Sequence, residues 1–227
     1  MEMPEEIVIA RRFRGPIDSG NGGYVSGRVA AFVDGPAEVT LRRPPPLDRP
    51  VRVEREGERV RVLDGEARVA EAGPAEVDVE VPAPVSYAEA EEARERHVRF
   101  DVEGFSECFT CGQREDGLQI HAGAITGREL EHAAPWLVEE ASPEIVWAAI
   151  DCPGAYAVGG PGRGEVVLGR MAAEVLRVPS PGERCVIVAW PLGEDRRKLY
   201  AGTALFAEDG ELLARARQTW IAPRPAS

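Results

Sequence analysis

The chain has few of the features that would tie it to a membrane. None of its apolar runs approaches the roughly 20 residues that a membrane-spanning helix needs. Its first residues, MEMPEEIVIA, hold neither a basic segment nor a long apolar segment, so they do not resemble a signal peptide. We therefore expect no membrane partner and a cytoplasmic location.

Basic residues are in the minority, and cysteines are rare. The 227 residues include 27 Lys and Arg against 39 Asp and Glu, which gives a formal net charge of −12. Such a charge repels polyanions at long range, so we expect no nucleic-acid partner. Four cysteines are too few for a disulfide scaffold at this length, and we expect them to be reduced.

Histidine is also scarce, with only His97, His121 and His132. None of them has a Ser or Cys partner in a recognisable nucleophile motif, which argues against a Ser–His or Cys–His hydrolase. We expect His97 to be solvated on a linker helix and His132 to be structural.

What the sequence does contain is an apparent internal repeat. Leu41–Val53, LRRPPPLDRPVRV, matches Leu176–Val188, LRVPSPGERCVIV, without a gap at Leu, Arg, Pro and Val positions. The similarity continues further along the chain, where Gly65–Ala67 matches Gly202–Ala204. A period this long favours two duplicated domains over a stacked repeat array, although strand–turn–strand segments can also look alike by chance. The strands predicted to correspond are 50–56 with 185–190, and 67–70 with 204–207.

Each half has the outline of one helix followed by about four antiparallel strands. Apolar spacing predicts long helices near 20–34 and 143–159. Gly and Pro divide most of the remainder into alternating segments typical of a strand meander. Further strands are predicted at 7–13, 75–81, 117–122 and 131–138. Near the C-terminus, Glu208–Gly210 predicts a hairpin turn between the last two strands.

The sequence thus divides into two units and a junction: an N-terminal unit at 1–82, a linker at 83–104 and a C-terminal unit at 105–227. Within the linker, Ser86 and Glu89 form a capping box, which predicts a short, solvated helix.

Each repeat places a Gly-rich helix entry just before its strand meander. These entries are Ser19–Tyr24 and Asp151–Tyr156, and their Gly and Tyr residues superpose at an offset of about 132 positions. A helix N-terminus offers unpaired amides and the positive end of the helix dipole. Glycine lets a substrate carbonyl approach such amides closely, where a developing oxyanion would be stabilised.

At this point the chain resembles the hotdog superfamily, specifically the double-hotdog arrangement of acyl-CoA thioesterase II-like proteins. The resemblance is carried by NGGYVSGRVAAFV at 21–33, similar to the family's His-Gly-Gly-Tyr helix entry, and by GELLARA at 210–216. It implies an α+β fold of two tandem hotdog units, each a curved antiparallel sheet around a long central helix. It further implies an acyl thioester as substrate, no cofactor besides the CoA of that substrate, and a homodimer of double hotdogs as a possible assembly.

The resemblance also suggests roles for individual residues. Asn21 stands where such thioesterases often carry His, and Asn can orient a carbonyl but cannot act as a base at neutral pH. The amides near Gly22 and Gly23 would bind the carbonyl. Tyr24, Trp147 and Tyr156 would line the acyl chain. Local cations would meet the CoA phosphates; Arg42, Arg43 and the cluster 196–198 are candidates.

Asp151 is the remaining candidate for a general base, because a lone carboxylate in an apolar element is costly unless it is paired or used. The alternative is that it only caps the helix beginning near Pro153. The expected function is hydrolysis of an acyl-CoA or acyl-carrier thioester at the interface of the two units. The rival expectation is a non-catalytic protein that binds acyl-CoA or another hydrophobic ligand on the same fold.

Cys108 and Cys111 form a CxxC pair, with His121 ten residues further on. These three residues would leave a closed zinc site one ligand short, and no second CxxC exists. A redox role is disfavoured because a Gly-rich turn follows the pair instead of a helix. We therefore predict reduced thiols on a turn, and no bound metal.

Overall fold

The structure is a computed structural model that describes residues 5–98, 105–159 and 166–223. Residues 99–104 of the expected linker lie outside these ranges. The described strands form one antiparallel sheet in the order β1-β3-β4-β5-β2-β8-β11-β10-β9-β7-β6. Their bounds are β1 Glu5–Val8, β2 Ala37–Leu41, β3 Pro50–Glu56, β4 Arg59–Asp64, β5 Ala67–Pro74, β6 Gly123–Ile125, β7 Arg128–Leu137, β8 Val167–Val175, β9 Arg184–Asp195, β10 Lys198–Ala207 and β11 Leu212–Ile221.

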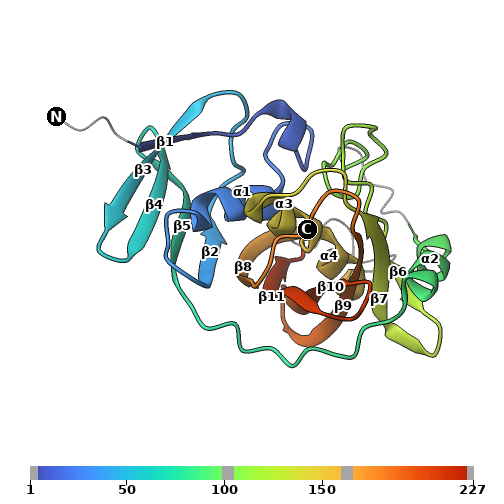
Figure 1. Cartoon of the computed structure of the whole chain (residues 1–227). Coiled ribbons are helices and arrows are strands. Elements are labelled where there is room, and N and C mark those ends of the chain that lie inside the picture. The colour runs from blue at the N-terminus through green and yellow to red at the C-terminus, as the bar shows by residue number, and fades with distance from the viewer. Residues whose placement is uncertain (1–4, 99–104, 160–165, 224–227) are drawn as a thin grey trace.

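The sheet curves around three short helices (Figure 1). These are α1 (Gly22–Ala30), α3 (Pro143–Ala149) and α4 (Cys152–Val158). Helix α1 packs against α3, while α4 packs against β9 and β10. Pairing of β2 with β8 joins the N-terminal strands to the C-terminal strands in one continuous sheet.

The segment from the end of β5 to α2 (Tyr87–Glu95) covers one face of the C-terminal strands. From β5 the chain runs in an extended path to α2, which lies against β6 and β7 (Figure 1). Val77 and Val79 on this path are buried in one cluster with Val186 and Val188 of β9. Strand β9 is therefore buried on both faces, and its apolar residues are consecutive. In a strand with one solvated face, apolar and polar residues would alternate.

The capping box of Ser86 and Glu89 is confirmed at the start of α2. The helix is less solvated than expected, because Ala90 and Ala93 are fully buried against the sheet. The hairpin turn between β10 and β11 is also confirmed, with Gly210 at a φ of 89°. Capping boxes and tight turns form between residues close in sequence, so they can be predicted without knowledge of long-range contacts.

The two long helices predicted by apolar spacing are wrong in length. Helix α1 ends at Ala30, and residues 31–33 continue only as a turn. The second predicted helix is split into α3 and α4 at Ile150 and Asp151. Pro153 explains the break, since it has no N–H to donate to the carbonyl of Ala149 and its ring would clash there.

One of the two predicted strand equivalences is wrong. Segments 50–56 and 185–190 occupy corresponding places, in β3 and β9. Segment 67–70, however, lies in the last strand of its meander, β5, and 204–207 lies in the middle strand, β10. By order in the sheet β5 corresponds to β11. Strands β9 and β10 have 12 and 10 residues against 7 and 6 in β3 and β4, so a nearly constant offset fails.

The remaining strand predictions are partly right. Strand β7 agrees with the strand predicted at 131–138. The strand predicted at 7–13 ends at Val8 and is followed by a 3₁₀ turn. Segments 75–81 and 117–122 are irregular. In 75–81 the buried Val side chains alternate as in a strand, but the segment packs across the sheet and pairs with no strand of the described chain.

Two glycines let α1 and α3 approach closely. A Cβ atom at Gly27 would lie 2.6 Å from Cα of Glu144, and one at Gly23 would lie 2.5 Å from the carbonyl oxygen of Trp147. Both contacts are with backbone, which cannot move aside as a flexible side chain can. The spacing of four residues places both glycines on one face of α1.

We expect Gly27→Ala to lower the free energy of unfolding by about 1–3 kcal/mol, because the added methyl group over-packs the helix contact. Urea unfolding measures the change. Gly73→Ala is the matched control, since its Cβ would meet only the side chain of Arg59 at 3.3 Å. Equal stability of the two variants would contradict this account of the helix contact.

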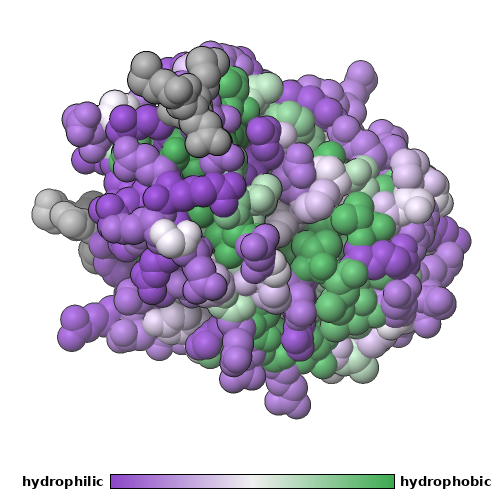
Figure 2. Space-filling model, turned by 60° about the vertical axis from the view of Figure 1, so that its left-hand side comes forward, coloured by the Kyte–Doolittle hydropathy of each residue, from purple (hydrophilic) through white to green (hydrophobic). Residues whose placement is uncertain are grey.

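Hydrophilic residues predominate on the face of the molecule drawn in Figure 2. On the face drawn in Figure 2, a band of hydrophobic residues interrupts the charged ones. Among the helices of the described ranges, none is both long and apolar enough to cross a membrane.

Candidate active site

Asn21 lies just before α1 and caps it. Its side-chain oxygen accepts the N–H of Tyr24 at 2.8 Å. Its amide nitrogen Nδ2 lies 3.3 Å from Oδ2 of Asp151, 130 residues away in sequence. Asn21 and Asp151 therefore meet, as the sequence-based reading expected.

Asp151 occupies the break between α3 and α4 and is only 2% exposed. Its side chain makes no hydrogen bond to its own helix, α4. Instead Oδ2 accepts the N–H of Gly23, in the first turn of α1, at 2.8 Å. The other oxygen, Oδ1, is buried and has no hydrogen-bond partner within the described residues. The carboxyl group thus caps the opposite helix with one oxygen, while the second is buried without a partner among the described residues.

Burial dominates the electrostatics of this carboxyl group. Loss of water raises the pKa of Asp151 to about 8, and the neighbouring Cys108 adds to this shift. The hydrogen bonds from Gly23 and Asn21 act in the opposite direction, because they favour the charged form.

Gln218 holds the backbone at the break. It lies on β11 and is fully buried. Its Nε2 donates to the carbonyl of Ile150 at 2.7 Å and lies 3.2 Å from that of Asp151, while its Oε1 accepts the indole N–H of Trp220 at 2.8 Å. Sequence reasoning missed this residue. The available signal was a lone amide side chain at a position where strand alternation predicts burial.

A cavity of about 280 Å³ opens beside Asn21, Gly22 and Asp151. Its lining is mostly apolar and draws on both halves of the sheet. The remaining lining residues are Gly15, Pro16, Ser19, Gly20, Leu41–Pro45, Phe105, Cys108, Cys152, Val166–Gly169, Trp220 and Ile221. Arg42 and Arg43, two of the expected phosphate-binding residues, are among them, and Arg42 also pairs with Glu71. Arg196 and Arg197 form the turn between β9 and β10, Lys198 begins β10, and none of the three lines this cavity.

The three aromatic residues expected to line the acyl chain are absent from this cavity's lining. Tyr24 stacks on Phe13, with ring centroids 3.8 Å apart, inside the core. Trp147 lines a separate cavity of about 320 Å³ beside Gly27. Tyr156 is buried with its ring 4.6 Å from that of His97.

Three free thiols gather next to the cavity. The sulfur atoms of Cys108, Cys111 and Cys152 all lie within 4.8 Å of one another. The first two lie on an irregular turn, as expected, but Cys152 at the start of α4 was not connected with them in sequence. His121 is not part of the group, and its Nε2 lies 3.3 Å from the carbonyl oxygen of Gly112. The prediction that His97 is solvated is wrong. Its side chain is part-buried, and Nδ1 lies 2.8 Å from the carbonyl oxygen of Ala122.

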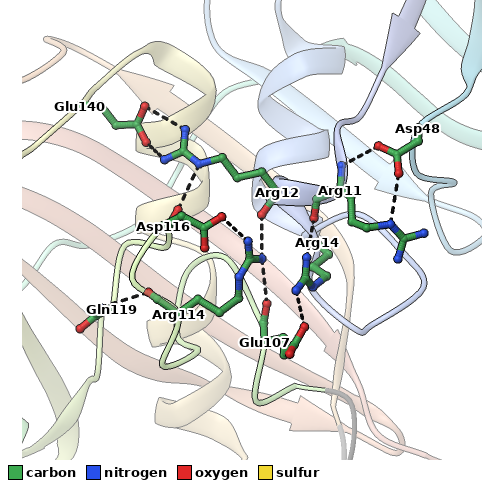
Figure 3. Close-up of polar contacts among 9 residues, drawn as sticks. All are labelled: Arg11, Arg12, Arg14, Asp48, Glu107, Arg114, Asp116, Gln119 and Glu140. Atoms are coloured by element: carbon green, nitrogen blue, oxygen red, sulfur yellow. Dashed lines mark hydrogen bonds and ion pairs between the residues drawn. The ribbon is translucent and has the colours of Figure 1, made fainter.

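An ion pair and hydrogen bonds attach the turn that carries two of these thiols to the segment before α1 (Figure 3). Arg14 pairs with Glu107 of the turn, and Nε of Arg12 donates to the carbonyl of Asp116 at 3.1 Å. Arg114 donates to the carbonyl of Arg12 at 3.0 Å. A backbone hydrogen bond of 2.7 Å from Phe109 to the carbonyl of Arg14 completes the attachment to the segment before α1. The thiol turn and the entry to α1 are therefore held together.

Solved structures show similarity over almost the whole chain. The acyl-CoA thioesterase II TesB2 of Mycobacterium marinum has 13% identity and a TM-score of 0.62, covering 99% of this chain and 96% of its own. The tesB protein of Mycobacterium avium subsp. paratuberculosis has 15% identity and a TM-score of 0.58, covering 90% and 87%. A hot dog fold protein of unknown function from Alicyclobacillus acidocaldarius has 12% identity and a TM-score of 0.53, covering 97% and 93%.

This chain therefore has a hotdog fold and is similar in structure to thioesterase II proteins. A scan against family models and a search of curated proteins found no match.

Proposed function

We propose that this protein hydrolyses an acyl thioester, of CoA or of an acyl carrier, in the cavity at the start of α1. The observation that carries the proposal is the convergence of Asn21, the first amides of α1 and the Asp151 carboxyl group at one mostly apolar cavity. The similarity to thioesterase II structures supports the same class of reaction.

The proposal includes two tandem hotdog units with the cavity at their interface. The sheet order supports this division, because the strands on the two sides of the β2–β8 junction follow equivalent orders. These orders are β3-β4-β5-β2 on one side and β9-β10-β11-β8 on the other. Units at 1–82 and 105–227 would each contribute to the cavity, the first through α1 and the second through Asp151, β8 and β11. We place the enzyme in the cytoplasm, with a homodimer of double hotdogs as the proposed assembly.

In the proposed reaction, the ionised form of Asp151, which predominates above its pKa of about 8, takes a proton from water through Oδ1, the oxygen that has no partner in the described structure. The water oxygen attacks the thioester carbonyl, and the resulting oxyanion accepts a hydrogen bond from the N–H of Gly22. As the first amide of α1, Gly22 has no acceptor within its own helix. The amide of Gly23 is already used by Asp151. The thiolate then leaves and takes the proton back from Asp151.

The cavity volume of about 280 Å³ is near the lower end of the roughly 300–1,000 Å³ range of ligand pockets. We therefore propose a short acyl group, with Arg42 and Arg43 at the lining available for the anionic part of the carrier. A thioester-release assay over acyl-CoA chain lengths tests the function. Release fastest with short acyl groups is expected, whereas no release above the spontaneous rate at any length would refute the proposal.

Asn21→Ala is expected to lower kcat by about 10–10³, less than loss of the base, because the backbone amides remain to hold the carbonyl. Stability should fall by about 1 kcal/mol through loss of the cap. Ser142→Ala is the matched control, since Ser142 caps α3 away from the cavity and should change stability alone. A kcat equal to that of the control would remove Asn21 from the mechanism.

Binding without catalysis is the second candidate. It is favoured by one observation: Oδ2 of Asp151 and the side-chain oxygen of Asn21 are both used to cap α1. Tight binding of acyl-CoA, measured by calorimetry, together with no turnover in the wild-type chain would establish this candidate instead.

A further inference from the structure

The group formed by Cys108, Cys111 and Cys152, the thiol cluster, has no part in the proposed hydrolysis. Its members come from two segments, a turn and the first residue of α4, and Cys108 and Cys152 are 44 residues apart. Their sulfur atoms are 3.7 Å apart. In a tetrahedral zinc site with Zn–S bonds of about 2.3 Å, neighbouring sulfurs are about 3.8 Å apart. This pair has the spacing of two sulfurs on one zinc ion, and the sulfur of Cys111 lies within 4.8 Å of both.

The turn is shaped around Cys108. The N–H of Gly112 donates to the carbonyl of Cys108 at 2.8 Å. A Cβ at Gly112 would lie 2.5 Å from that carbonyl oxygen and 2.7 Å from the Cys108 nitrogen, so a side chain has no room there. The turn thus closes tightly over the first cysteine of the pair and sets Cys111 beside it.

Several donors point at the sulfur of Cys108. Hydrogen bonds from the thiols of Cys111 and Cys152, and from the backbone N–H groups of Cys111 and Thr110, converge on this sulfur. Asn21 Nδ2 adds contacts of 3.6 Å to Cys108 and 3.9 Å to Cys152. Donors of this kind around thiolates are the usual outer support of a metal site.

The cluster is protected but has an entry path. Cys108 and Cys152 are 1% and 8% exposed, yet both contribute to the lining of the 280 Å³ cavity. The ion pair between Arg14 and Glu107 and the hydrogen bond from Arg114 to the carbonyl of Arg12 hold the turn against the segment before α1 (Figure 3). Three thiol groups therefore lie in a fixed arrangement, and two of them border the cavity from which an ion or a water molecule can enter.

We propose that Cys108, Cys111 and Cys152 bind one zinc ion, with water in the fourth position. Thiolate ligands suit zinc, and a site with three protein ligands and one open position is an established arrangement for it. This proposal replaces the sequence-based prediction of no metal, which counted only the CxxC pair and His121. It does not depend on the thioesterase proposal, since the metal content is measured without any substrate.

Metal analysis of the full chain, purified under reducing conditions without chelator, tests the proposal. About one zinc per chain is expected in the wild type. Cys108→Ser, Cys111→Ser and Cys152→Ser should each lose most of it, while Cys185→Ser should keep it. Cys185 is the matched control, because it is a buried free cysteine of β9 outside the cluster.

Cobalt substitution keeps the test independent of variant folding. The wild-type chain, stripped of metal and given Co²⁺, should gain the near-ultraviolet absorption of thiolate-to-cobalt charge transfer. A reduced wild-type chain with no zinc and no such absorption would overturn the proposal. So would zinc that stays bound in all three cluster variants, or a disulfide between cluster members in the protein as purified.

Discussion

Asp151→Asn is expected to lower kcat for acyl-CoA hydrolysis by about 10²–10⁴, the usual contribution of a general base. Asn has nearly the same shape, and its side-chain oxygen can still accept the N–H of Gly23, which bonds Asp151 at 2.8 Å in the wild type. The fold and the affinity for the acyl group should therefore remain close to wild type. Steady-state kinetics and calorimetric binding measure the two quantities separately.

The control for this variant is Asp195→Asn, which makes the same change at an exposed position at the end of β9. It should leave kcat unchanged. Equal turnover in both variants would remove Asp151 as the base, even if hydrolysis itself were confirmed.

Gln218→Ala should lower the free energy of unfolding by about 2–5 kcal/mol. The substitution leaves the carbonyls of Ile150 and Asp151 and the indole N–H of Trp220 without their partner in the core. Each buried polar group left unsatisfied costs about 1–3 kcal/mol. Urea unfolding followed by circular dichroism measures the difference.

The same variant should also lower kcat under conditions where it remains folded, because the backbone that carries Asp151 loses its anchor on β11. Gln113→Ala is the matched control, since Gln113 is exposed on the thiol turn. A Gln218→Ala protein as stable as this control would show that the backbone between α3 and α4 keeps its conformation without the hydrogen bonds of Gln218.

Features determined by neighbouring residues were predictable from the sequence. The capping box at Ser86, the turn ending at Gly210 and the strand at 50–56 follow from local hydrogen bonding, backbone freedom and alternation. The helix break at Asp151 was also within reach, because Pro153 is visible in the sequence. Apolar spacing concealed it, since the buried residues of α3 and α4 continue one pattern across the break.

The candidate site depended on contacts that no local pattern encodes. Asn21 and Asp151 are 130 residues apart, and they were paired only through the resemblance to double-hotdog thioesterases. Cys152 joins the CxxC pair, and Gln218 supports Asp151, through packing of distant elements. The glycines at the start of α1 were interpreted as letting a substrate carbonyl approach the helix amides. In the structure, Gly23 and Gly27 also leave room for α3 to pack closely.

A crystal structure of Asp151→Asn with bound short-chain acyl-CoA tests the central claim most directly. The account predicts the acyl group in the cavity beside Asn21, with the thioester carbonyl oxygen within hydrogen-bond reach of the Gly22 N–H. An acyl group in the separate cavity beside Trp147, or a carbonyl directed away from the start of α1, would contradict it.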